Sequence, residues 1–300
     1  MKNFENKVAV ITGGASGLGR EFANTAASLG MKLVLADVQQ DALDQAKAKL
    51  EARGVAVLAM LCDVRKGEQV QALADATMAA YGGVHLLFNN AGVGSGGLIW
   101  ENSEADWEWV LGVNVWGVIH GVRIFTRLML ECAARDPQFE GHIVNTASMA
   151  GLLNAPTMGV YNVSKHAVVS LSETLYHDLQ LVDAPIGASV LCPYFVPTGI
   201  SQSHRNRPSD VKMTAGPTAS QMAAQAMTVK AVESGKVSAA DVARITFDAI
   251  RDGQFYIYSH PQALGGVGER MDDIVHMRNP SDPYKATPHV REMLRAKMQA

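Results

Sequence analysis

The chain has 300 residues, 48% of them hydrophobic and 18% charged, and a formal net charge of −3 from 26 basic and 29 acidic residues. This composition is typical of a globular protein with a large core, and it excludes a disordered chain. The near balance of charge gives no basic patch for nucleic acid or an anionic membrane surface. The longest apolar stretch, residues 110–125, contains Asn114, His120 and Arg123, so we expect no membrane span there.

Cysteine usage and the N-terminal residues indicate the compartment. Three cysteines, Cys62, Cys132 and Cys192, are too few for a disulfide framework, and none belongs to a Cys-x-x-Cys pair. The first seven residues lack the basic-then-apolar layout of a signal peptide. We therefore expect a cytoplasmic protein.

Short apolar segments alternate with helical segments along most of the chain. We expect strands at residues 7–12, 32–37, 55–62, 84–89, 142–147, 188–192 and 255–259. We expect helices at residues 18–29, 40–53, 68–81, 103–134 and 158–181, the fourth broken near Gly112 or Gly117, and another from Ser238. This alternation indicates a parallel sheet covered on both faces. The sequence predicts an α/β fold, a single Rossmann-type, doubly wound domain of about seven parallel strands flanked by helices, over residues 1–260.

Two regions depart from this alternation. Residues 194–235 are rich in Ala, Met, Gln, Ser and Pro, and a loop of that length is uncommon unless it is functional. We interpret them as a small substrate lid. Residues 261–300 hold four prolines and show no strand–helix alternation. We interpret them as a C-terminal extension that contacts another subunit or the active site.

A glycine-rich run, residues 12–19, lies between the first strand and the first helix. Glycines at this position let the backbone turn tightly and approach a pyrophosphate, which the N-terminus of the helix then binds. A purely structural turn is the alternative, but the strand before it and the helix after it favour dinucleotide binding. We predict that the cofactor is bound here by Gly13, Ser16, Gly17, Leu18 and Gly19.

Asp37 ends the second strand, 18 residues after Gly19. A carboxylate at about this offset hydrogen-bonds the adenosine ribose 2′-OH and repels a 2′-phosphate. We therefore predict NAD rather than NADP, the alternative being an ordinary strand-end acid or helix cap. The nearest basic residues, Arg20 and Arg65, are expected to face water.

Tyr161 and Lys165 stand at i and i+4 in a predicted helix, so that their side chains share one face. A nearby ammonium favours the phenolate and lowers the pKa of a tyrosine, which makes it a general acid or base at the working pH. Such pairs are common by chance, so this pair needs support from other motifs.

That support comes from the order of five motifs, because the chain resembles the short-chain dehydrogenase/reductase superfamily over about residues 5–260. The motifs are the glycine run at 12–19, Asp63-Val64, the Asn-Asn-Ala-Gly run at 89–92, Ser148, and Tyr161-x-x-x-Lys165. Ser148 precedes Tyr161 by 13 residues, as in that family, and Asn114 matches the fourth catalytic position.

The resemblance implies a catalytic role for four residues. Tyr161 would exchange a proton with the substrate oxygen while a hydride moves to or from the nicotinamide. Lys165 would bond the nicotinamide ribose and lower the pKa of Tyr161. Ser148 would hydrogen-bond the substrate oxygen, and Asn114 would support a water relay. Taken singly, Asn114 could instead satisfy backbone groups inside a helix, and Ser148 could cap a turn.

The resemblance also implies the remaining cofactor contacts. Asp63 and Val64 would flank the adenine, and Asn89, Asn90, Ala91 and Gly92 would shape the channel. After the sixth strand, Pro193, Val196 and Thr198 would contact the cofactor, although Tyr194 stands where the family usually has glycine. That ring should reshape the pocket beside the nicotinamide.

The predicted substrate pocket is apolar. Its candidates are Ser148, Leu152, Leu153, Met158, Tyr161, Tyr194, Phe195 and either Met213 or Met222. No Lys or Arg stands among them to bind a carboxylate, so we expect a small hydrophobic or aromatic secondary alcohol or ketone. A weaker likeness to bacterial Cα-dehydrogenases of lignin aryl ethers agrees with this. The histidines show no metal-ligand spacing, and no metal site is expected.

The sequence thus predicts an NAD-preferring oxidoreductase that interconverts a secondary alcohol and a ketone. The resemblance implies a homotetramer or homodimer, formed through the long helices around Asn114 and Tyr161. An NADPH-dependent ketoreductase is the first alternative. A non-catalytic dinucleotide-binding protein is less favoured because all four catalytic positions are intact. A sugar-nucleotide epimerase would need a larger C-terminal domain.

Overall fold

The structure is a computed structural model that describes residues 1–212 and 216–299. One sheet holds seven parallel strands in the order β3-β2-β1-β4-β5-β6-β7. The strands are β1 (Val8–Thr12), β2 (Lys32–Asp37), β3 (Val57–Leu61), β4 (Leu86–Asn89), β5 (Gly141–Thr146), β6 (Ile186–Cys192) and β7 (Tyr256–Tyr258). The predicted fold class is therefore confirmed. The strand order reverses between β1 and β4, and ligands bind at such a point.

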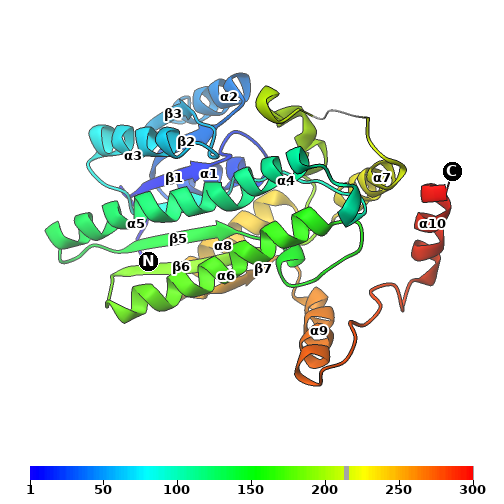
Figure 1. The fold of residues 1–300 in the computed structure, drawn as a ribbon. Helices are drawn as coiled ribbons and strands as arrows, with labels where there is room; N and C mark the ends of the chain where they lie inside the picture. The colour runs from blue at the N-terminus through cyan, green and yellow to red at the C-terminus, as the bar shows by residue number, and fades with distance from the viewer. Residues whose placement is uncertain (213–215, 300) are drawn as a thin grey trace.

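Helices cover both faces of the sheet (Figure 1). They are α1 (Gly17–Ser28), α2 (Gln40–Glu51), α3 (Gly67–Tyr81), α4 (Glu104–Leu111), α5 (Gly117–Arg135), α6 (Gly159–Leu181), α7 (Ala219–Glu233), α8 (Ala239–Asp252), α9 (Gly265–Val275) and α10 (Pro288–Gln299). In Figure 1, α5 and α6 cross the near face, while α8 lies behind the sheet. This is the doubly wound arrangement that alternating strands and helices predict.

Alternate residues of β1 belong to two separate hydrophobic cores, one on each face of the sheet. Ile11 packs with Phe22 of α1 and Phe247 of α8, whereas Val10 packs with Phe125 of α5 on the opposite face. Successive side chains of a strand point to opposite faces, so an unbroken apolar run is needed where both faces are covered. The sheet is thereby fixed between two helical layers, and its loops at the carboxyl ends are held in place.

The long helical stretch is interrupted at the predicted place, by a π-helical turn over Gly112–Trp116 that joins α4 to α5. Glycines let α5 approach the sheet very closely: a Cβ on Gly121 would lie 1.9 Å from Asn89 Oδ1, and one on Gly117 would lie 2.7 Å from Val64 Cγ2. By length and composition alone, the helical stretch Glu104–Arg135 could span a membrane. However, 44% of its apolar 18-residue window is buried inside the fold, and the stretch packs here against the sheet.

Both irregular regions contain more helix than the sequence predicted. The lid region holds two 3₁₀ turns, η4 (Gly199–Asn206) and η5 (Ser209–Val211), and the helix α7. The extension holds η6 (Pro261–Leu264), α9 and α10, the last packed against α7. The sequence pattern did not predict α9, because the glycines at its start have low helix propensity.

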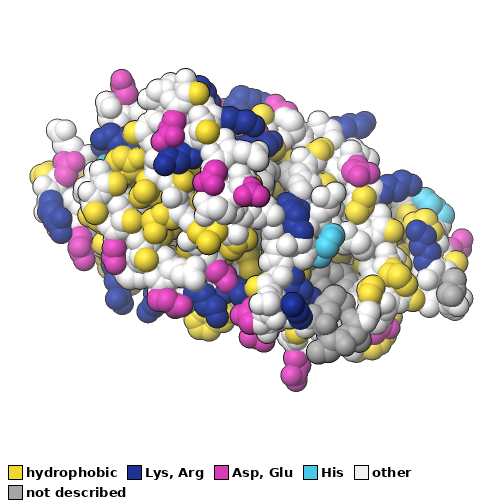
Figure 2. Space-filling model, turned by 90° about the horizontal axis from the view of Figure 1, so that it is seen from above, with side chains coloured by type: hydrophobic (Ala, Val, Ile, Leu, Met, Phe, Trp, Pro, Cys, Tyr) yellow, Lys and Arg dark blue, Asp and Glu magenta, His cyan; other side chains and the backbone are white. Residues whose placement is uncertain are grey.

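Charges of both signs are scattered over the face seen in Figure 2, without a field of one sign there. This arrangement follows from the near-balanced composition.

Candidate active site

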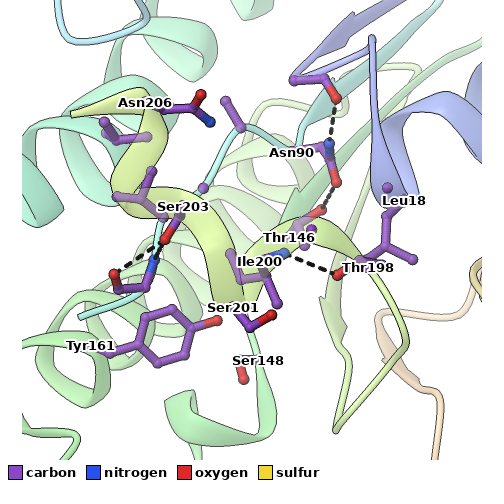
Figure 3. Close-up of a pocket in the computed structure, with 18 of the residues that line it drawn as sticks. Leu18, Asn90, Thr146, Ser148, Tyr161, Thr198, Ile200, Ser201, Ser203 and Asn206 are labelled. Carbon is purple, nitrogen blue, oxygen red and sulfur yellow. Dashed lines mark hydrogen bonds between the residues drawn. The ribbon is translucent and has the colours of Figure 1, made fainter. Parts of the chain in front are cut away.

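A cavity of about 710 Å³ opens at the carboxyl ends of the strands, where the strand order reverses. It brings together the glycine loop, the ends of β2, β3 and β5, the start of α6, and the segment after β6 (Figure 3). Of the residues predicted to bind cofactor, it is lined by Gly13, Ser16, Gly17, Leu18, Asp37, Asp63, Val64, Asn90, Ala91, Gly92, Tyr161, Lys165, Pro193, Val196 and Thr198.

The glycine loop is a cradle that side chains would fill. Gly13 and Gly17 have φ of +63° and +52°, a region that favours glycine. Gly19, which does not line the cavity, sits so close to the loop that a Cβ would lie 2.0 Å from Gly13 O. Ser16 then leads into the N-terminus of α1. Exposed backbone at a helix N-terminus fits the pyrophosphate of a dinucleotide.

Asn90 fastens the strand ends around this cradle. Its Nδ2 donates to Thr12 O at 3.0 Å. Its Oδ1 accepts from Thr146 Oγ1 at 3.4 Å (Figure 3). Its neighbour Asn89 points into the protein and donates to Asn145 Oδ1 at 2.8 Å, so it does not line the cavity. Asn89 therefore supports the channel through its contact with Asn145 and does not line it.

Asp37 lies at the far end of the cavity and is only 8% exposed. Its carboxylate accepts backbone N–H groups from Ala15 and Gln39, each at 3.1 Å. Burial raises the pKa of Asp37 above its ordinary value. These hydrogen bonds and the charge of Arg205 offset only part of that rise. The backbone bonds fix the carboxylate at the edge of β2, where a ribose hydroxyl would be recognised.

The basic residues near Asp37 differ from those expected. Arg20 is exposed and pairs with Glu21, as predicted. Arg65, expected in water, is instead mostly buried between Asp63, at 2.6 Å, and Asp210, at 3.2 Å, and it lines the cavity. The prediction that Arg65 faces water was wrong, because its partner Asp210 lies 145 residues further along the sequence. Arg205, whose charge reaches Asp37, was missed because it lies in the irregular lid region.

Tyr161, Ser148 and Lys165 converge on one side of the cavity. In Figure 3 the Tyr161 hydroxyl points toward Ser148 and Ser201, and its hydrogen bond with Ser148 lowers the pKa of Tyr161. Ser148 Oγ also accepts from Ala150 N at 3.1 Å, which orients the hydroxyl. Ser148 therefore does cap the short turn Met149–Gly151, and it does so while facing the cavity.

The pKa direction of Tyr161 differs from the one predicted. Burial raises the pKa of Tyr161 above its ordinary value, and this effect exceeds that of the Ser148 bond. Burial also lowers the pKa of Lys165 to about 8, so its charge is itself disfavoured. Lys165 Nζ donates to Thr146 O at 2.9 Å and lies 5.6 Å from the centre of the Tyr161 ring. Lys165 does not contribute the expected lowering, and the burial of the Tyr161 phenol sets the direction of its pKa.

Asn114 is wholly buried in the π-helical turn and does not line the cavity. Its Oδ1 accepts from Val93 N at 2.8 Å, and its Nδ2 donates to Val93 O and to Ser164 Oγ, both at 3.0 Å. A Cβ on Gly92 would lie 3.5 Å from both Asn114 Oδ1 and Lys165 Nζ. Asn114 thus holds the backbone that faces Lys165.

The wall on the substrate side is mostly apolar. Of the predicted residues it includes Ser148, Leu153, Met158, Tyr161, Tyr194 and Phe195. Leu152 is not part of the lining; it packs with Val168 and Val169 of α6 instead. Met222 is 55% exposed and also lies off the lining, while Met213 lies outside the described residues.

The half-exposed Tyr194 ring packs against Phe195, with ring centres 4.5 Å apart, and against His260 at 5.9 Å. Helix α7, which also lines the cavity, was missed by the sequence analysis. It contributes Gln225, Thr228 and Val232. The Thr218-x-x-Gln221 capping box that begins α7 could have revealed this helix.

Comparison with known proteins agrees with this geometry. Residues 7–209 match the family model described as short chain dehydrogenase. The chain belongs to the short-chain dehydrogenase/reductase family. It is thus an oxidoreductase that acts on CH–OH groups and uses a nicotinamide dinucleotide.

Three relatives span nearly the whole chain. A short-chain dehydrogenase/reductase from Burkholderia phymatum, solved in complex with NAD, is 56% identical, with a TM-score of 0.92 over 94% of this chain and 99% of that one. A CLA biosynthesis dehydrogenase/reductase of Lactiplantibacillus plantarum is 32% identical over 92% of this chain and 95% of its own. A C alpha-dehydrogenase of Sphingobium is 31% identical over 98% and 94%. The predicted likeness to Cα-dehydrogenases is confirmed.

Proposed function

We propose that this protein is an NAD-preferring oxidoreductase that interconverts a hydrophobic or aromatic secondary alcohol and its ketone, with Tyr161 as the acid/base. The observation that carries this proposal is the convergence of Tyr161, Ser148 and Lys165 on one side of the cavity whose other end holds the glycine cradle and Asp37. A non-catalytic dinucleotide-binding protein would have no need for these three side chains to converge.

The residues divide the work as follows. When bound, the nicotinamide supplies the redox chemistry, because it accepts or gives up the hydride. In alcohol oxidation the Tyr161 phenolate takes the hydroxyl proton, and in ketone reduction the Tyr161 phenol returns it. Ser148 donates a hydrogen bond to the same substrate oxygen, where negative charge develops. Lys165 would bond the nicotinamide ribose, and its charge would then favour the phenolate.

We propose that Asn114 supports Tyr161, Ser148 and Lys165 without lining the cavity itself. It fixes Val93 and, through Ser164, the first turns of α6 that carry Tyr161. A water relay from Lys165 toward Asn114, as the family resemblance implies, would run past Gly92, which has no side chain to block it. Asn114 is therefore both a structural clamp and the inner end of the proton path.

The preference for NAD is inferred from Asp37. A fixed carboxylate that accepts two backbone N–H groups is pre-organised to accept a ribose hydroxyl and would repel a 2′-phosphate. One observation favours the NADPH-dependent alternative, since Arg205 lies near enough to influence the pKa of Asp37. However, Arg205 Nη1 already donates to Gly199 O and Gln202 O, which makes it less available to a phosphate.

The substrate class is inferred from the wall. Leu153, Met158 and Phe195 offer apolar contacts, and Gln225 and Thr228 of α7 add polar groups to the lining. The C-terminal extension supports this wall from outside: a Cβ on Gly266 would lie 3.4 Å from Leu153 Cδ2. We propose that residues 261–300 serve the active site in this way, in a cytoplasmic homotetramer or homodimer.

Steady-state turnover of a panel of aryl and cyclic secondary alcohols, with NAD⁺ and with NADP⁺, tests this proposal. We expect turnover with at least one apolar alcohol and a kcat/KM that is higher with NAD⁺. A strong preference for NADP⁺ would contradict the role of Asp37. Turnover confined to charged substrates would contradict the apolar pocket.

A further inference from the structure

The segment after β6 crosses the cofactor groove, and we call residues 199–211 the strap. Eight of its residues line the cavity as a roof: Gly199, Ile200, Ser201, Ser203, Arg205, Asn206, Arg207 and Pro208. It starts at Thr198, whose side chain lies 3.4 Å from the position of a Cβ on Gly17 in the phosphate loop. Figure 3 shows the strap passing over the cavity between Thr198 and Asn206.

The strap reaches the end of the groove where the adenosine would lie. Asn206 Oδ1 accepts from Gln39 Nε2 at 2.7 Å, and Gln39 follows Asp37 by two residues. Asp210 accepts from Arg65 Nη2 at 3.2 Å, and Arg65 follows Asp63 by two residues. Each bond thus joins the strap to a loop that carries a residue expected to contact adenosine.

The other attachments of the strap are more deeply seated. Arg207 Nη1 pairs with Asp106 at 2.5 Å, the two side chains being 11% and 4% exposed, and its guanidinium lies 5.1 Å from the Trp109 ring centre. Ser203 Oγ accepts from Gly94 N at 2.9 Å and donates to Gly94 O at 3.2 Å. These contacts hold the strap on the β4 and α4 side of the groove.

The outer attachments, by contrast, are each reached by water on one side. Asp210 is 52% exposed although its partner Arg65 is only 10% exposed, and the Gln39–Asn206 bond is only partly buried. A segment held at one edge by exposed polar bonds opens at low free-energy cost, because water replaces those bonds. Val211 is the strap's buried apolar side chain, and it packs on the α4 side with Trp109 and Val110.

We propose that the strap closes over the adenosine half of the dinucleotide, and that the Gln39–Asn206 and Arg65–Asp210 bonds set how fast the dinucleotide leaves. Asn206 and Asp210 are then positioning residues for the cofactor. The strap turns about its anchor at Arg207 and Asp106. Opening at the Gln39 and Arg65 edge uncovers the adenosine site.

Stopped-flow fluorescence of bound NADH, displaced by excess NAD⁺, tests this proposal on Asp210→Asn and Gln39→Ala. Each lost bond should raise the NADH dissociation rate roughly twofold to tenfold. The matched control is Asp248→Asn, because Asp248 is 51% exposed and pairs with Arg251 on α8, away from the cavity. The control should leave the rate unchanged, and Asp210→Glu should restore most of the wild-type rate.

Salt provides a second measurement. The wild-type dissociation rate should rise with ionic strength, because salt screens an exposed ion pair, and Asp210→Asn should lose most of that dependence. Equal dissociation rates for Asp210→Asn, Gln39→Ala and Asp248→Asn would overturn the proposal. Repeating the series with NADPH distinguishes a failure of the strap proposal from a failure of the proposed NAD preference. If only the cofactor preference is wrong, a different dinucleotide binds, but the same variants still release it faster.

Discussion

Asn114 holds both backbone groups of Val93, accepting its N–H at 2.8 Å and donating to its carbonyl oxygen at 3.0 Å. The π-helical turn over Gly112–Trp116 places the amide for this purpose. The segment that follows β4 and faces Lys165 is therefore fixed by one side chain from the neighbouring helix.

Asn114→Ala should lower the free energy of unfolding by about 2–4 kcal/mol, because it leaves the buried Val93 N–H without its partner. Urea denaturation measures this loss. Gln71→Ala, which removes an exposed side-chain bond on α3, is the control and should cost less than about 0.5 kcal/mol. Equal costs for the two variants would show that Asn114 does not clamp Val93.

Lys165→Met should stabilise the unliganded protein at neutral pH while removing activity. Burial lowers the pKa of Lys165 from 10.5 to about 8, so the folded state carries the charge at a cost of about 3 kcal/mol. Between these two pH values the unfolded chain binds a proton that the folded chain lacks, and the stability of the wild type rises with pH.

The difference in stability between Lys165→Met and the wild type should therefore shrink as pH rises from about 8 to 10.5. Denaturation curves recorded across this range measure it. Lys230→Met, on the exposed surface of α7, should show no such trend. A difference that does not change with pH would contradict the burial of charge at Lys165.

Asp37→Ser should weaken the preference for NAD⁺. Loss of a charged acceptor for the ribose hydroxyl should raise the KM for NAD⁺ by about tenfold or more, and loss of its repulsion should improve turnover with NADP⁺. The ratio of kcat/KM for the two cofactors measures the effect. An unchanged ratio would mean that Asp37 serves only the backbone of Ala15 and Gln39.

The two directions of the reaction should respond oppositely to pH. Burial raises the pKa of Tyr161, so the phenol that reduction needs predominates at neutral pH. Oxidation needs the phenolate, and its kcat/KM should therefore climb as pH rises, while that of reduction falls on the alkaline side. Profiles of kcat/KM in both directions test this, and parallel profiles would contradict Tyr161 as the acid/base.

The sequence predicted the fold, and nearly all of its candidate cofactor residues line the cavity, because both depend on local spacing. The glycine run, Asp37 at a strand end, and the Tyr161–Lys165 pair can each be recognised within a few residues. Contacts such as Arg207–Asp106 and Arg65–Asp210 could not be predicted, because they join residues more than a hundred positions apart. The predicted lowering of the Tyr161 pKa was wrong for a related reason, because the burial that raises this pKa is a property of the whole fold.

Turnover by Tyr161→Phe tests the central claim most directly, because the substitution removes one oxygen atom and keeps the ring. NADH formation should be followed with the best alcohol from the panel, and NADH binding measured by fluorescence as the control. We predict that kcat falls by a factor of about 10² to 10⁴ while NADH binding is retained. A variant that binds NADH and turns over at the wild-type rate would contradict the proposed mechanism.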